Sequence, residues 1–70
     1  MHISYAPLWR MLKKRHMRKE DLKIKAKLTS NMIANMGKGE NINLNTLVRI
    51  CMALDCNIPD VLELVRDGRE

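Results

Sequence analysis

Aromatic side chains are almost absent from this sequence: it has no phenylalanine, and Tyr5 and Trp9 are its only aromatic residues. Aliphatic and methionine side chains must therefore fill the interior. The two cysteines, Cys51 and Cys56, are too few for a disulfide scaffold, and they have no metal-type spacing with the histidines. We therefore expect no metal and no other cofactor, and a reducing compartment is the simplest setting.

Long apolar runs are also missing. No stretch approaches the length that spans a membrane, and the N-terminus lacks the basic-then-apolar order of a signal peptide. The 70 residues suffice for one small domain, residues 1–70, near the lower limit for folding without disulfides, a metal or a partner subunit. With 46% apolar residues the chain can build one core, so we expect it to be folded.

Charge is present but unevenly distributed. Residues 1–38 hold ten basic and two acidic side chains, a net of +8, whereas residues 39–70 hold three basic and six acidic ones, a net of −3. A basic half joined to a mildly acidic half suggests one face for a polyanion and another face for something else. Nucleic acid is the leading candidate polyanion, and a solvated surface with accidental clustering is the alternative.

Apolar residues recur at helical spacing, and no strand pattern appears, so an all-α fold is predicted. The segment 1–6 is expected to be a frayed or extended lead-in. We expect five helices, over residues 7–15, from 19 to 26 or 27, over 30–36, from a cap at Asn43 or Asn45 to about 54, and from 58 until Gly68 ends the last one.

The segment 19–38 organises the chain. Leu22 and Ala26 share one face of the first short helix, and Leu28 is the only apolar residue of the connection. Either Thr29 or Ser30 can cap the second short helix. Two helices joined by about four residues, each with one apolar stripe, match a helix-turn-helix, whose second helix enters a DNA major groove.

Single residues outside this segment have modest interpretations. His16 is expected to be a helix cap or a solvated residue, since no nucleophile or carboxylate accompanies it for catalysis. Cys51 is interpreted as a small buried hydrophobe and Cys56 as a core residue of the link that follows. Leu64 lies off the apolar face of the last helix, which leaves a dimer contact and a stray surface leucine open.

At this point the residues resemble a known family, the Cro and phage-repressor class of bacterial helix-turn-helix regulators, in particular its short stand-alone members of the xenobiotic-response-element type. The resemblance covers about residues 7–66 and implies a five-helix, lambda-repressor-like DNA-binding fold. The matching positions, in chain order, are Lys19, Leu22, Leu28, Thr29, Ile33, Ala34, Gly37, Lys38, Gly39, Leu47, Ile50, Ala53, Leu54 and the segment from Ile58 to Leu62.

Two positions depart from the family pattern. Lys23 stands where the family usually has a small residue, and we expect its long side chain to extend out to solvent. Lys27 stands where the family usually has glycine in a left-handed conformation, which costs a lysine about 1 kcal/mol. These changes affect the angle between the two helices more than the fold.

The resemblance also implies which residues contact DNA. Lys19 corresponds to the residue that anchors a DNA phosphate. Arg18, beside it, would add positive charge to the same surface. Base edges would be contacted by Ser30, Asn31 and Asn35, with Met32 beside them either as a contact or as a core residue. Lys38 and Asn41 would hold the DNA backbone. Asparagine can pair with adenine and methionine can contact a thymine methyl group, so we expect readout of adenine and thymine.

The leading hypothesis is a sequence-specific regulator of transcription that binds double-stranded DNA. No enzymatic role is expected, since no triad, phosphate loop or metal set can be assembled. A homodimer that represses by promoter occlusion is expected. An antitoxin that binds its own operator and a toxin protein, and an adaptor that binds only protein, are the alternatives. Such a bacterial or phage regulator would act in the cytoplasm, associated with the nucleoid.

Overall fold

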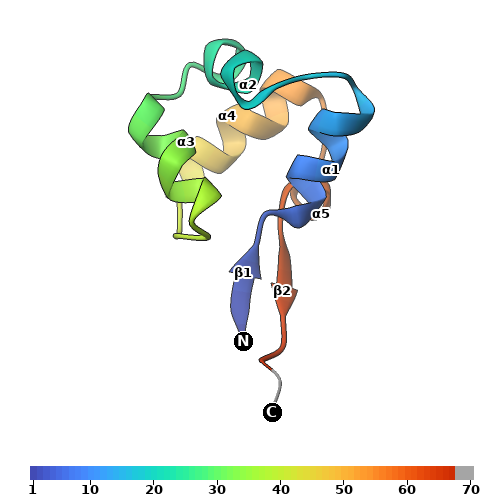
Figure 1. Cartoon of the computed structure of the whole chain (residues 1–70), viewed down its shortest axis with the longest axis vertical. Helices are drawn as coiled ribbons and strands as arrows, with labels where there is room; N and C mark the ends of the chain where they lie inside the picture. The colour runs from blue at the N-terminus through green and yellow to red at the C-terminus, as the bar shows by residue number, and fades with distance from the viewer. Residues whose placement is uncertain (68–70) are drawn as a thin grey trace.

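The structure, a computed structural model, describes residues 1–67. Its elements follow in the order β1 (His2–Ser4), α1 (Ala6–Lys14), α2 (Lys19–Ala26), α3 (Ser30–Gly37), α4 (Leu44–Leu54), α5 (Ile58–Val61) and β2 (Glu63–Val65). The helices form one body from which the two strands project together (Figure 1). Five helices in this order confirm the helical fold that the sequence predicts, and the strand pair is an addition to it.

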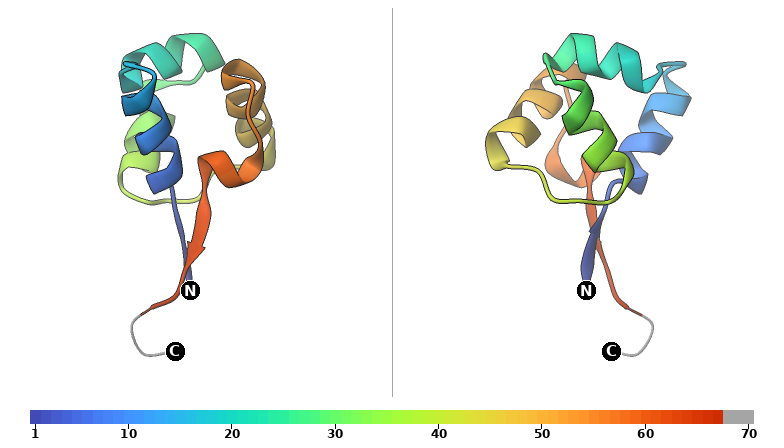
Figure 2. Two further views of the ribbon diagram at one scale, coloured as in Figure 1. Left: turned by 90° about the vertical axis from the view of Figure 1, so that its right-hand side faces the viewer. Right: turned by 60° about the vertical axis from the view of Figure 1, so that its left-hand side comes forward.

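The helices enclose a core of aliphatic and methionine side chains, as the scarcity of aromatic residues requires. Helix α1 packs against α5, and α2 packs against both α3 and α4. Figure 2 shows these helices surrounding a common interior. The largest side chains with less than 2% of their surface exposed come from all five helices: Leu8, Leu22, Met36, Ile50, Leu54 and Val61.

Of the two expectations for residues 1–6, the extended lead-in is confirmed over His2–Ser4 and the frayed one is wrong, because strand pairing orders the segment. Strand β1 pairs antiparallel with β2, with Ile3 opposite Leu64. Tyr5 follows β1 and is only 2% exposed; its hydroxyl donates a hydrogen bond of 2.6 Å to the carbonyl oxygen of Glu40. Burial raises the pKa of the Tyr5 phenol. The order of this segment comes from a long-range contact, because each residue of β1 pairs with a residue 59 to 63 positions later in the chain.

The last helix is shorter than the sequence predicts. Helix α5 ends at Val61, because Leu62 takes an extended conformation (φ −140°, ψ 162°) and leads into β2. Val65, expected on the helix, lies in β2, and Leu64 is exposed there. The five aliphatic residues among positions 58–65 fit a helix or an extended segment, and pairing with β1 decides between them. Gly68, the expected helix end, lies outside the described residues.

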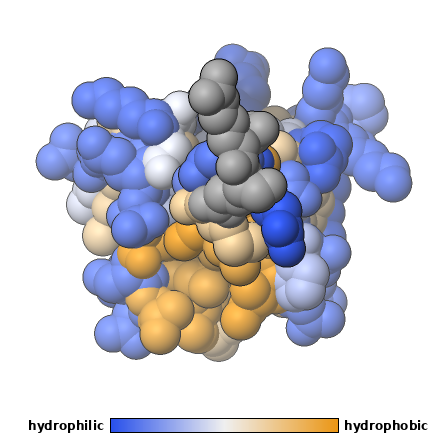
Figure 3. Space-filling model, turned by 90° about the horizontal axis from the view of Figure 1, so that it is seen from below, coloured by the Kyte–Doolittle hydropathy of each residue, from blue (hydrophilic) through white to orange (hydrophobic). Residues whose placement is uncertain are grey.

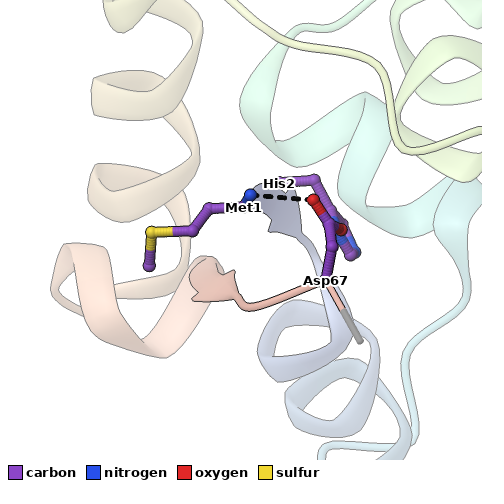
Figure 4. Close-up of polar contacts among 3 residues, drawn as sticks. All are labelled: Met1, His2 and Asp67. Atoms are coloured by element: carbon purple, nitrogen blue, oxygen red, sulfur yellow. Dashed lines mark hydrogen bonds and ion pairs between the residues drawn. The ribbon is translucent and has the colours of Figure 1, made fainter. Parts of the chain in front are cut away.

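Strands β1 and β2 together form a two-stranded ribbon, and a pair of polar contacts joins the chain ends beside it (Figure 4). The N-terminal ammonium of Met1 lies 2.8 Å from Oδ2 of Asp67, and Nδ1 of His2 lies 2.7 Å from Oδ1 of the same carboxylate. These contacts hold the pKa of Asp67 below its ordinary value. All three residues are exposed, so these contacts contribute little to the stability of the fold.

Three helices end at residues that take a left-handed conformation without being glycine: His16 (φ 57°), Lys27 (φ 57°) and Asp55 (φ 51°). After each, the next amide N–H bonds back into the helix, as from Leu28 to the carbonyl oxygen of Lys23 at 2.8 Å. This is the Schellman arrangement, which satisfies the last carbonyl groups of a helix. The positive φ expected for Lys27 is therefore confirmed, and Cys56, in the third of these turns, is half-buried against the core together with Cys51.

Candidate nucleic-acid interface

The turn between α2 and α3 sets the direction of the second helix. Leu28 is buried in the core, and the Thr29 hydroxyl accepts a hydrogen bond of 3.1 Å from the amide of Met32. Thr29 is therefore the N-cap, which decides between the two candidates that the sequence left open. With the cap filled by Thr29, the next residue, Ser30, begins the helix with its side chain exposed.

Helix α3 turns one side to the core and the other to solvent. Met36 is 1% exposed and Ile33 packs against the core, as predicted. On the outer side Ser30 and Asn31 are exposed and Asn35 is half-buried. Figure 2, in its right-hand view, shows α3 at the front of the molecule with nothing drawn over it. The polar side chains on α3 are thus at the surface and not in the interior.

The structure adds one residue to this surface and reassigns another. Ala34 is exposed, three residues after Asn31 and four after Ser30, so it lies on the same side of the helix. Helical spacing alone could have indicated it. Met32 is half-buried and packs against the core, so its side chain is divided between the two roles that the sequence left open.

Lys23, at the position where the family has a small residue, reaches from α2 to the start of α3. Its Nζ lies 3.2 Å from Oγ of Ser30 and 3.1 Å from Oε1 of Glu20. The side chain is 25% exposed, so it extends to the surface as expected. Because the ammonium donates this hydrogen bond, the Ser30 hydroxyl keeps its own hydrogen for a partner outside the protein.

Lys19, the first residue of α2, is held at a place that the sequence did not indicate. Its Nζ lies 4.6 Å from the centroid of the Trp9 ring, a cation–π distance. The same Nζ lies 3.6 Å from the point where a Cβ on Gly37 would stand. Lys19 therefore joins the start of α2 to the end of α3, and Trp9 is the residue that sequence reasoning missed.

The other residues proposed to contact the DNA backbone lie at the surface, but they do not all lie close to one another. Lys38 is exposed as the C-cap of α3, directly after Gly37 and therefore near Lys19. Arg18 is exposed at the N-cap of α2, where its amide donates to Oδ2 of Asp21 at 2.8 Å. Asn41 is exposed in the loop before α4. The structure shows no contact that ties Arg18 or Asn41 to the outer side of α3 among residues 1–67.

Two arginines make structural hydrogen bonds and lie away from the outer side of α3. Arg15 donates from its guanidinium to the carbonyl oxygen of Leu54 at 2.7 Å, where α4 ends. Arg49 donates to the carbonyl oxygen of Lys27 at 3.4 Å, where α2 ends. Cations at helix C-termini are favourable, so these side chains stabilise the fold.

Within residues 1–67, no group of three or more His, Cys, Asp or Glu side chains is arranged to hold a metal ion. Over the same residues, no helix has the length and apolar character needed to cross a membrane.

Comparisons with known proteins agree with this geometry. The sequence profile of the Cro/C1-type HTH DNA-binding domain matches residues 7–67. The solved structure of the transcriptional regulator VanUg (crystal form II) is similar over 94% of this chain and 88% of that chain, with 33% sequence identity and a TM-score of 0.89. No match was found among curated proteins. The chain belongs to the Cro/C1-type helix-turn-helix family of DNA-binding domains.

Proposed function

We propose that this protein is a transcriptional regulator that binds double-stranded DNA at specific sequences and represses by covering promoters as a dimer. The observation that carries the proposal is the outer side of α3, where Ser30, Asn31 and Asn35 lie at the surface. Lys19 and Lys38 flank the far end of the same helix. A polar helix face bordered by cations suits insertion into a major groove between two phosphate backbones.

Base readout is assigned to the uncharged residues of α3. Asn31 and Asn35 can each pair bidentately with adenine, and the methyl group of Ala34 can contact a thymine methyl group. Ser30 can donate its free hydroxyl hydrogen to a base edge. Helix α3 holds no arginine or lysine, the side chains that usually pair with guanine, so the preferred half-site is rich in adenine and thymine.

Affinity is assigned to the cations around α3. Arg18, Lys19 and Lys38 supply phosphate contacts, and Asn41 adds a neutral one. With three cationic contacts per copy in a dimer, the logarithm of the binding constant should fall with the logarithm of salt concentration with a slope of about −5. The protein would act on the nucleoid in the cytoplasm, without a cofactor and without catalysis.

Selection of bound duplexes from a random DNA pool tests the proposal. We expect an enriched palindrome with adenine- and thymine-rich half-sites whose centres lie about one helical turn apart. Binding to the selected site, measured at two salt concentrations, should show the steep salt dependence given above. Failure to enrich any sequence would contradict the assignment. Similarly weak binding at both salt concentrations would favour a protein-binding adaptor instead.

The exposed apolar side chains on α4 favour a contact with another protein molecule in addition to DNA. Leu44, Val48 and Met52 are each more than half exposed. They lie on a different helix from the proposed DNA contacts, so the two surfaces can act at the same time. An antitoxin that binds its operator and a toxin would use such an arrangement, and so would a homodimeric repressor.

A further inference from the structure

One side of α4 carries an apolar stripe that no described part of the chain covers. The α4 stripe consists of Leu44, Val48 and Met52, four residues apart, which are 76%, 54% and 77% exposed. Ile58, at the start of α5, is also more than half exposed. Figure 3 shows a continuous hydrophobic area along the lower edge of the face that it draws. Contiguous apolar surface on a small folded protein marks an interaction site.

A shallow cleft of about 320 Å³ runs beside the stripe, between α4 and α5. Val48 and Met52 form one wall and Ile58 the other, with Cys51 and Cys56 at the junction of the two helices. The cleft is a recess beside the stripe into which an apolar side chain of a partner can insert. A surface that has both a protruding apolar residue and an apolar recess can pack against another copy of itself.

The two edges of the stripe carry opposite charges. Met52 is in the middle, because it lines both the cleft toward α5 and a second cleft toward α2. Asp55 lines the cleft on the α5 side, and Arg49 lines the cleft on the α2 side. The stripe is thus apolar along its centre, basic along one edge and acidic along the other.

We infer that the α4 stripe is the contact between two copies of this chain, related by a twofold axis that runs along α4. With the two helices side by side and parallel, the Arg49 edge of each copy faces the Asp55 edge of the other. An antiparallel arrangement would instead place Arg49 against Arg49 and Asp55 against Asp55, which like charges disfavour. The inference specifies the surface used by the proposed dimer, and its test requires no DNA.

The charge of the whole chain supports a second copy on this side. The half that contains α1, α2 and α3 has a net charge of +8, so two copies repel each other if those helices meet. The half that contains α4 and α5 has a net charge of −3, and the stripe itself is uncharged. Association through α4 therefore also leaves the outer side of α3 free in both copies.

The size of the stripe sets the strength of the contact. Stable interfaces bury roughly 800 Å² on each partner, and an eleven-residue helix such as α4 is only about 16 Å long. The α4 stripe with Ile58 is smaller than such an interface. The dimer should therefore dissociate on dilution in the micromolar range, and the operator would hold the two copies together.

Sedimentation equilibrium of the full chain without DNA tests the inference. The wild type should change from monomer to dimer as its concentration rises. Val48→Glu and Met52→Glu should each raise the dissociation constant of the dimer at least tenfold. Ile24→Glu is the matched control: Ile24 is 69% exposed on α2, lines neither cleft, and undergoes the same change of charge. It should leave the dimer intact, and thermal melting should show that all variants are folded.

Charge reversal tests the parallel arrangement. Arg49→Glu and Asp55→Lys should each weaken the dimer, and the double variant should restore it. Lysine is acceptable at position 55 because Lys27 holds the same left-handed conformation in this fold (φ 57° against 51°). Weakening that the double variant does not reverse would overturn the parallel arrangement. A wild type that stays monomeric at millimolar concentration, or that uses these residues only for a different protein, would overturn the inference while leaving DNA binding untouched.

Discussion

The ammonium group of Lys19 stands over the face of Trp9, with 4.6 Å between Nζ and the ring centroid. Lys19 begins α2, Trp9 lies within α1, and the same Nζ approaches the end of α3 at Gly37. A proposed phosphate anchor is therefore oriented by an aromatic ring before any DNA arrives. Orientation in advance reduces the entropy that is lost on binding.

Replacing Trp9 by leucine should weaken DNA binding about two- to fivefold, because the cation–π contact contributes about 0.5–1 kcal/mol at an exposed site. Fluorescence anisotropy with the selected operator would measure the loss. Trp9→Phe keeps a ring and should lose less. In a Lys19→Met background, Trp9→Leu should have no further effect on binding, and an unchanged effect there would contradict the orienting role.

Asn31→Ala should reduce the discrimination between matched and mismatched operators by about 1–3 kcal/mol at one base pair, because it removes the proposed bidentate contact to a base. The comparison is Lys38→Gln, which should weaken binding to all sequences alike and lower the salt slope by about one unit per copy. Titration of single-mismatch duplexes at two salt concentrations separates the two effects. If Lys38→Gln changed the sequence preference more than Asn31→Ala did, the assignment of base readout to α3 would be wrong.

Lys27→Gly should stabilise the fold by roughly 0.5–1 kcal/mol. Lysine pays a steric cost at φ 57° that glycine does not, and part of the gain is offset by the greater freedom of glycine in the unfolded chain. Urea denaturation followed by circular dichroism would measure the change. Lys25→Gly, within α2 and also exposed, should instead destabilise by about 1 kcal/mol.

The contacts at the ribbon end should be lost in acid. The folded-state pKa of Asp67 is lowered from its ordinary value of 3.8, first by the hydrogen bond from the N-terminal ammonium and then by that from His2. Because the pKa of the carboxyl group is lower in the folded state, ionised Asp67 stabilises the folded state at pH values above the ordinary pKa. This contribution disappears as the pH falls through the folded-state pKa.

Amide hydrogen exchange in β1 is the measurement for this contact. At neutral pH, Asp67→Asn should exchange faster than the wild type, after correction for intrinsic rates, and the difference should vanish well below pH 3.8. Glu63→Gln removes a carboxylate from the other end of β2 and should leave a smaller effect. A difference between wild type and Asp67→Asn that persisted in strong acid would contradict the role of the carboxylate.

What could be predicted from the sequence depended on local signals. Leu47, Ile50 and Leu54 repeat at helical spacing, and Thr29 and Asn43 are caps, so the helices and their starts could be predicted closely. The strands could not, because residues 2–4 and 63–65 are extended only through each other. Their pairing depends on contacts between the two chain ends, which no local window contains.

The candidate site follows the same division. The spacing of Ser30, Asn31 and Asn35 placed them on one side of a single helix, and the structure has them at the surface. Trp9 could not be linked to Lys19 from the sequence, since the contact depends on how α1 packs beside α2. The exposure of Met52 could not be predicted either, because a long apolar pattern on α4 does not indicate which of its residues lack a packing neighbour.

The division of α3 into a buried side and an outer side has a consequence for how such a protein changes over generations. Met36 and Ile33 pack the helix against the core, whereas Asn31 and Ala34 are exposed and do not pack against it. Under the proposed function, exchanging the outer side chains would redirect the protein to other DNA sequences at little cost in folding. New target preferences could thus arise by a few substitutions on a scaffold that stays the same.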